Sequence, residues 1–232
     1  MAQTTVKVRI AEYVAFGGPA TPVVAPDGFT AGPTDPGEYV VAYCGKHRSK
    51  RYKTWSSIPW GAKLKDTRTD VMVEVDGKWK SATKLTGVSR ADVMSYNQQL
   101  YGSRVVPGEW VFNDFGHMTC YFFKDKNQNG RLDPKAGEKI SGEFFHTTPA
   151  DEAATKLNVP VQLDESHGCI HLKPNDIDEL IAKKYMRKGN RIVVHKYTEH
   201  SIGYSLAPHA VPPFELHFYP ALNKLVVVGT RR

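Results

Sequence analysis

Short strand-like segments separated by glycine and proline constrain the fold of this chain more than any other feature. Residues 6–16 alternate apolar and polar side chains, and 38–44, 140–145 and 191–195 are similar short runs. Residues 17–37 carry many glycines and prolines, which is typical of an ordered loop. We therefore expect a mainly β fold, a mixed sheet or β-sandwich with a few helices.

Local turn and cap signals predict further elements. Asp76-Gly77 is a favoured pair for a tight turn with positive φ, so residues 71–80 predict a hairpin. Ser89 is a suitable N-cap for a helix that runs to Tyr101. Residues 109–115 and 118–124 predict two more strands.

A second helix is expected near the end of the chain. Asn175 is a suitable N-cap, and acidic residues follow it while basic residues gather toward residue 188, as a helix dipole favours. Gly189 suits the position just beyond the end of that helix. The strand over 191–195 follows at once.

A chain of 232 residues is long enough for one domain with a small appendage. Residues 214–219 and 224–228 predict one more hairpin, and several prolines separate it from the rest. We expect a main domain over 1–200, with a C-terminal hairpin extension over 201–232 packed on it.

The formal net charge of +7 favours anionic partners, which include nucleic acid, a membrane surface and an anionic cell-wall polymer. The densest basic run is 46–53, and no nucleic-acid-binding motif accompanies it, so we expect no nucleic-acid partner. No apolar run is long enough to predict a transmembrane helix. Residues 1–7 lack the apolar core of a secretory signal.

Three cysteines, Cys44, Cys120 and Cys169, leave at least one thiol unpaired within the chain. Cys44 and Cys120 could pair in an oxidising compartment or lie reduced in buried strands. We favour the buried, reduced state, because buried free cysteine is common.

Potentially reactive side chains are most concentrated in residues 166–172, where Cys169 lies between His167 and His171 and directly after Gly168. A thiolate is the reactive form of cysteine, and a nearby imidazole can generate it. His146 ends an apolar run a little over twenty residues upstream. A Cys and a His that meet in space suffice for acyl transfer through a thiolate.

These residues carry a family resemblance. Ser166-His167-Gly168-Cys169 before an apolar residue, with His146 upstream, resembles the L,D-transpeptidase family with its YkuD-type catalytic domain. Residues 35–40 are similar to an early strand of that family, and 175–194 to its helix, glycine stop and closing strand. The resemblance covers roughly residues 30–196. His171 departs from it, because the family usually has Arg or Asn there.

The resemblance implies roles for the motif residues. Cys169 would be the nucleophile and His146 its base, with the backbone carbonyl of Thr147 orienting the imidazole. Backbone N–H groups around Gly168 and Cys169 would stabilise the oxyanion. The residues expected to line the substrate channel are Ser166, His167 and His171.

The resemblance also implies the substrate and its place. The enzyme would act on peptidoglycan stem peptides in the cell envelope, on the periplasmic or cell-wall side, and would require no cofactor. It would form 3→3 cross-links or exchange the terminal D-amino acid. An L,D-carboxypeptidase and a secreted wall-degrading effector would use the same site. A non-enzymatic wall-binding module that uses the basic surface is the remaining alternative.

Two metal hypotheses stand beside this interpretation. His146, His167, Cys169 and His171 are four potential zinc ligands, but their spacing is no strong zinc signature. Residues 125–133 are similar to the first nine positions of a calcium loop, although Ala136 occupies the twelfth. Such a run is also an ordinary turn. A structural Ca²⁺ is one prediction, with these ligands: Asp125, Asn127, Asn129, Asp133 and Glu138.

Overall fold

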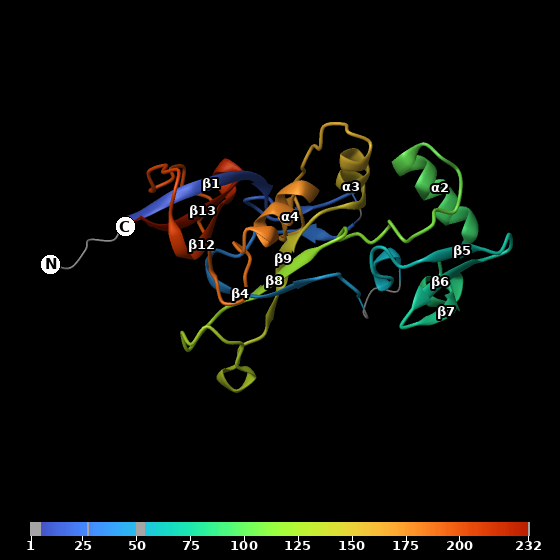
Figure 1. Ribbon diagram of the computed structural model, residues 1–232, viewed down its shortest axis with the longest axis horizontal. Helices are drawn as coiled ribbons and strands as arrows, with labels where there is room; N and C mark the ends of the chain where they lie inside the picture. The colour runs from blue at the N-terminus through green and yellow to red at the C-terminus, as the bar shows by residue number, and fades with distance from the viewer. Residues whose placement is uncertain (1–5, 27, 50–53, 232) are drawn as a thin grey trace. The chain divides into compact units, whose positions relative to one another are not determined.

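The computed structural model describes residues 6–26, 28–49 and 54–231, in two compact units. The first unit comprises Met1–Cys44, Cys120–His146 and Leu163–Arg232, and the second comprises Gly45–Thr119 and Thr147–Gln162. The chain therefore leaves the first unit twice, after Cys44 and after His146. Each unit has its own set of strands and helices (Figure 1).

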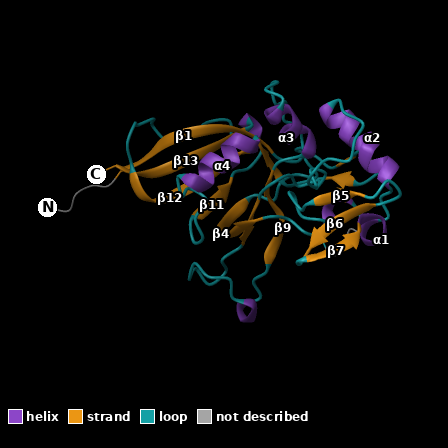
Figure 2. Cartoon of the chain, turned by 45° about the vertical axis from the view of Figure 1, so that its right-hand side comes forward, coloured by secondary structure: helices purple, strands orange, loops and turns teal. Residues whose placement is uncertain are grey.

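Eight strands close into a barrel in the order β1-β10-β9-β8-β4-β11-β12-β13 (Figure 2). β10 pairs in parallel with β9 and β11 with β12, whereas the pairs of β1 with β10 and β13, and of β11 with β4, are antiparallel. The expected mainly β fold with a mixed sheet is confirmed. Its strands are β1 (Val6–Phe16), β4 (Gly37–Gly45), β8 (Thr119–Phe123), β9 (Ile140–His146), β10 (Ile170–Leu172), β11 (Arg191–Val194), β12 (Val211–Tyr219) and β13 (Lys224–Arg231).

The C-terminal hairpin belongs to this barrel. β12 pairs with β11 and β13 pairs with β1, so the hairpin completes the closed order of strands. The central part of β13 is buried on both faces, because Leu225 and Val227 alternate with Val226 and Val228 and all four are fully buried. Val226 and Val228 pack on Tyr219. The partly buried side chains packed against this cluster are Ile202, Tyr204 and Leu222.

Helix α4 (Pro174–Ala182) buries Ile177 and Leu180 in the first unit. The predicted N-cap at Asn175 is wrong, because Pro174 takes the first helical position and Lys173 is the extended residue before it. The predicted end at Gly189 is also wrong, since the helix stops at Ala182 and Lys184 adopts positive φ. The first unit also contains β2 (Val23–Val24), β3 (Thr30–Ala31), and short 3₁₀ turns at Pro134–Ala136 and Pro220–Leu222.

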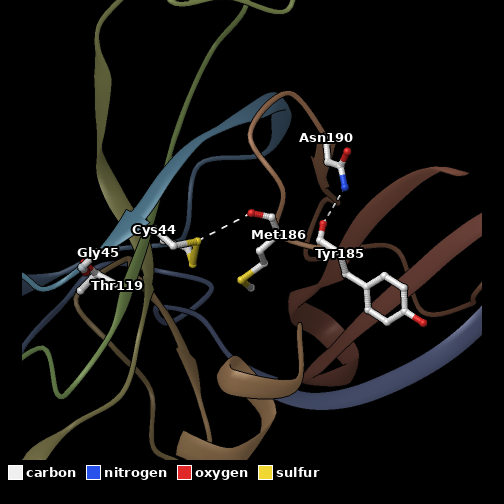
Figure 3. Close-up of a disulfide and its surroundings, with 7 residues drawn as sticks. Cys44, Gly45, Thr119, Tyr185, Met186 and Asn190 are labelled. Atoms are coloured by element: carbon white, nitrogen blue, oxygen red, sulfur yellow. Dashed lines mark hydrogen bonds between the residues drawn. A yellow bond between two sulfur atoms is a disulfide. The ribbon is translucent and has the colours of Figure 1, made fainter. Parts of the chain in front are cut away.

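Cys44 at the end of β4 and Cys120 on β8 form a disulfide across neighbouring strands (Figure 3). The expectation that both are reduced is therefore wrong. The two residues lie 76 positions apart in sequence, but strand pairing brings their Cα atoms within 4.0 Å. Cys44 Sγ also lies 3.7 Å from the carbonyl oxygen of Met186, a contact without a proton because the sulfur is oxidised.

The second unit holds a three-stranded sheet, β5-β6-β7, and three helices. The hairpin at Asp76-Gly77 and the helix capped by Ser89 are confirmed, the latter with a full capping box to Asp92. The strand predicted over 109–115 is wrong, since this segment is irregular although Trp110 and Phe112 are fully buried. The elements are β5 (Leu64–Asp66), β6 (Val71–Val75), β7 (Lys78–Ser81), α1 (Ala82–Thr86), α2 (Arg90–Tyr101) and α3 (Pro149–Lys156), with a 3₁₀ turn at Trp55–Ser57.

None of the helices in the described part of the chain is long and apolar enough to cross a membrane.

Candidate active site

The parallel pairing of β9 with β10 assembles the centre of the predicted site. Its register sets Phe145 opposite Ile170 and His146 opposite His171, so β9 ends on His146 beside the start of β10. Cys169 is the residue just before β10. Two segments more than twenty residues apart in sequence therefore meet at neighbouring strand ends. His146 is buried and Cys169 is partly buried.

The turn before Cys169 is held by hydrogen bonds. The Ser166 N–H donates to the Gly17 carbonyl at 2.9 Å, and the Ser166 hydroxyl donates to the Cys169 carbonyl. The same hydroxyl oxygen accepts the Gly168 N–H at 2.9 Å. The Gly168 N–H is thus engaged within the turn, and Ser166 positions the backbone on both sides of it.

Close backbone approach makes two glycines necessary here. Gly168 has φ +130°, which favours glycine. A Cβ on Gly18 would lie 1.8 Å from the Gly32 carbonyl oxygen and 3.0 Å from the Gly168 nitrogen. The loop over 17–37 therefore packs its backbone directly against the turn that presents Cys169.

The surroundings of Cys169 favour the protonated thiol. Burial raises its pKa to about 12; the negative charge of Glu143 also raises it, whereas a hydrogen bond from the Phe144 backbone lowers it. A thiolate at neutral pH therefore needs a base that takes the proton as the sulfur attacks. Cys169 as nucleophile stays a prediction, and Glu143, whose proximity depends on the β9–β10 register, was not among the predicted site residues.

His171 packs against the expected base. Its ring lies edge-on to that of His146, with 4.6 Å between ring centroids. Its Nδ1 lies 2.9 Å from the Asp164 carbonyl oxygen, so Nδ1 donates the proton. Burial lowers the pKa of His171 and favours the neutral ring. His167, by contrast, is exposed to solvent.

Thr147, which follows His146, belongs to the second unit and is anchored there. Its hydroxyl donates to Glu152 Oε1, which also accepts the His117 N–H at 3.0 Å. A Cβ on Gly116 would lie 1.8 Å from Thr147 Oγ1, so glycine is required at that point. Neither Glu152 nor α3 was predicted, although Thr148, Pro149 and Asp151 form a recognisable helix start: Thr148 is the N-cap and accepts the Asp151 N–H.

The proposed metal ligands lie in two places, around Cys169 and in the 125–138 loop. Among the residues described, no group of three or more His, Cys, Asp or Glu side chains is placed so that it could hold a metal ion. In the 125–138 loop, Asp125 accepts the N–H groups of Asn129 and Gly130, and Glu138 accepts those of Lys126 and Asp133. Calcium binding by this loop stays a prediction.

The predicted basic run lies partly outside the described residues, which omit 50–53. Within the described part, Arg48 pairs with Asp76 at 3.0 Å in the second unit. The ring of His47 packs on Phe115, with 4.1 Å between centroids.

Comparison with protein families agrees with the architecture and the motif. Residues 3–194 match the family model described as YkuD, the L,D-transpeptidase catalytic domain. The chain therefore belongs to the L,D-transpeptidase catalytic domain family, whose activity is directed at peptidoglycan in the cell wall. Neither the search of curated proteins nor that of solved structures gave a match.

Proposed function

We propose that this protein transfers an acyl group from a peptidoglycan stem peptide through a thioester on Cys169. The observation that carries the proposal is the β9–β10 register, in which His146 and the residues after Cys169 share neighbouring strand ends. The donor is a stem ending in D-alanine, attacked at the carbonyl of the L-centre of diaminopimelate. No cofactor is needed, since a thiol and an imidazole supply the chemistry.

The first half-reaction forms the thioester. His146 takes the Sγ proton of Cys169 as the sulfur attacks the peptide carbonyl, and a tetrahedral oxyanion forms. Collapse of this intermediate breaks the C–N bond, and His146 returns the proton to the departing D-alanine nitrogen. The high pKa of the Cys169 thiol supports transfer of its proton during attack, rather than a thiolate already present in the resting enzyme.

The oxyanion needs at least one backbone donor. Since the Gly168 N–H donates to Ser166 Oγ, we assign this role to the N–H of Cys169 itself. Such a donor is typically worth about 3 kcal/mol in the transition state. The carbonyl of Thr147 would orient His146, and Glu152 would hold Thr147 in place. We assign His167 and His171 to the walls of the substrate channel.

The second half-reaction defines the product. An amine from another stem gives a 3→3 cross-link, a free D-amino acid gives exchange, and water gives trimming by L,D-carboxypeptidase action. The net charge of +7 supports association with an anionic wall polymer. The Cys44–Cys120 disulfide supports an oxidising compartment, in keeping with the cell envelope. A secreted effector that attacks another cell's wall fits the same site.

Mass spectrometry after incubation with a carbapenem tests the nucleophile. We expect one adduct on the wild-type protein and none on Cys169→Ala. A wild-type protein that gains no adduct, or a Cys169→Ala variant that does, would contradict the mechanism and favour the non-enzymatic wall-binding module. Product analysis with tetrapeptide muropeptides then separates cross-linking from exchange and trimming.

A further inference from the structure

Glu143 lies beside the turn that presents the nucleophile. Phe145 on β9 is paired in register with Ile170 on β10. Glu143 lies two residues before Phe145, and Gly168 lies two residues before Ile170, so the two are at matching positions. A Cβ added to Gly168 would lie 3.4 Å from Glu143 Oε1 and 3.7 Å from its Cγ. The carboxylate therefore lies next to Gly168, the residue before Cys169.

Hydrogen bonds fix the position of this carboxylate, and Lys124 offsets its charge only in part, without a direct ion pair. Its two oxygens accept the Asp35 N–H at 3.2 and 3.1 Å, and a carboxylate has further acceptor sites. Lys124, the nearby cation, forms its ion pair with Asp35 at 2.7 Å. Within the described residues Glu143 has no ion pair of its own. Burial raises the pKa of Glu143 and the negative charge of Asp35 raises it further, whereas the hydrogen bond from the Asp35 N–H and the positive charge of Lys124 lower it.

The negative charge of Glu143 beside the Cys169 sulfur opposes the first half-reaction, because it disfavours a thiolate and an oxyanion. The same charge assists the second half-reaction when the acceptor is an ammonium ion, which it attracts toward the thioester. Water and neutral acceptors gain nothing from it. The carboxylate therefore discriminates between acceptors by their charge.

We propose that Glu143 is a specificity-determining residue that binds the cationic amino group of the acyl acceptor at the Cys169 thioester. This inference rests on the proposed function and extends it to the acceptor. It predicts that amines are preferred over water, and that aminolysis rather than hydrolysis is the main outcome.

The balance of the step is simple. The acceptor ammonium loses one proton to His146, its nitrogen attacks the thioester carbonyl, and the tetrahedral intermediate expels the sulfur. A C–N bond forms and the C–S bond breaks. The sulfur recovers a proton from His146, and the second proton from nitrogen is released to solvent. Glu143 exchanges no proton in this scheme and acts by its charge alone.

The test compares Glu143→Gln, which keeps the shape and removes the charge, with Glu38→Gln. Glu38 lies on β4 and pairs with Arg191, so its variant changes the net charge equally elsewhere. Each protein receives a tetrapeptide donor with one of two acceptors. Glycinamide is cationic near neutral pH, and hydroxylamine is uncharged. The readout is the ratio of aminolysis to hydrolysis for each acceptor.

We expect Glu143→Gln to lower this ratio about fivefold to tenfold for glycinamide and to leave it unchanged for hydroxylamine. Glu38→Gln should match the wild type with both. Equal ratios in Glu143→Gln and wild type, with thioester formation intact, would overturn the role of Glu143 alone. A wild-type protein that forms no thioester would overturn both this inference and the proposed function.

A second readout needs no substrate. Cys169 is the free cysteine of the chain, so iodoacetamide reports on its thiol alone. Because the charge of Glu143 raises the thiol pKa, Glu143→Gln should be alkylated faster than wild type at a given alkaline pH. An unchanged alkylation rate would mean that the charge does not act at the sulfur.

Discussion

His146 and His171 lie edge to face, with their ring planes at 81° and their centroids 4.6 Å apart. The contact arises from the β9–β10 register, which sets the two residues directly opposite. His171 stands at the position where the family resemblance would place Arg or Asn. The His146 ring is the proposed base, and the His171 ring packs against it and limits its movement.

His171→Asn should remove this ring contact while leaving the proposed base, His146, in place. Aromatic pairs of this kind are worth about 1 kcal/mol beyond the area that they bury, so we expect a loss of about that size in unfolding free energy. Acylation by a carbapenem should slow but persist. Denaturant unfolding and timed mass spectrometry measure the two effects. His167→Asn, at an exposed position, is the control; an equal loss there would show that the ring contact is unimportant.

Stability should fall when the pH is lowered from 7 to 5. Burial lowers the pKa of His47, His171 and His217, so the folded protein binds fewer protons at these sites than the unfolded chain. Their stabilisation is complete above the unfolded pKa of ~6.5 and is lost as the pH falls toward the lower folded values. Each group contributes a slope of at most about 1.4 kcal/mol per pH unit.

Chemical denaturation across this pH range checks the sign. His171→Asn should show a shallower dependence than wild type, because one of the three groups is gone. The pKa of Glu215 is lowered to about 2, so its protonation also reduces the stability of the fold, but only below this pH range. Stability that rises on acidification from pH 7 to 5 would refute the assignment.

Thr147→Val should test the anchor of the backbone carbonyl that we propose orients His146. The variant keeps the side-chain shape but leaves Glu152 without the Thr147 hydroxyl donor. We expect acylation to slow about tenfold, which corresponds to about 1.4 kcal/mol, with little change in KM for the donor. Thr155→Val on α3 is the matched control. A rise in KM at constant kcat would instead place Thr147 in donor binding.

The disulfide should contribute strongly to stability. It closes a loop with a sequence separation of 76, for which chain entropy predicts a stabilisation of about 4 kcal/mol. Cys44→Ala with Cys120→Ala should therefore lower the denaturation midpoint markedly, whereas Cys169→Ala should leave it near that of wild type. Thiol titration of the denatured protein should find one thiol before reduction and three after. Three thiols before reduction would contradict the pairing.

Calcium should raise the melting temperature if the 125–138 loop binds it. Asp125 uses one acceptor site on each oxygen for backbone N–H groups and keeps others for a cation. Scanning fluorimetry with calcium and with EDTA is sufficient, with Asp125→Asn as the test variant and Asp178→Asn as the control. A wild-type melting temperature unaffected by either reagent would identify the loop as a metal-free turn.

Local chemistry accounts for the parts of the fold that the sequence predicted. Asp76-Gly77 and Ser89 act through their immediate neighbours, and both elements form as expected. The predicted N-cap at Asn175 is wrong because Pro174 takes the first position of the same helix. Residues 109–115 are apolar enough for a strand, but tertiary packing buries them without one.

Residues of the candidate site could be proposed from the sequence where a motif contains them, but not where long-range strand pairing brings them together. Cys169 and His146 stand in recognisable patterns. The proximity of Glu143 to Gly168 follows from a parallel strand pair, which no local pattern encodes. The partnership of Cys44 with Cys120 depends on the neighbouring placement of β4 and β8 for the same reason.

Cys44 and Cys120 stand at the two points where the chain leaves the first unit and returns to it. Their bond makes residues 45–119 a side loop of a covalently continuous barrel chain. Cleavage by a protease anywhere within that loop would therefore leave the two fragments joined. Under oxidising conditions, β4 would stay in one molecule with His146 at the end of β9 and Cys169 before β10 after such a cut.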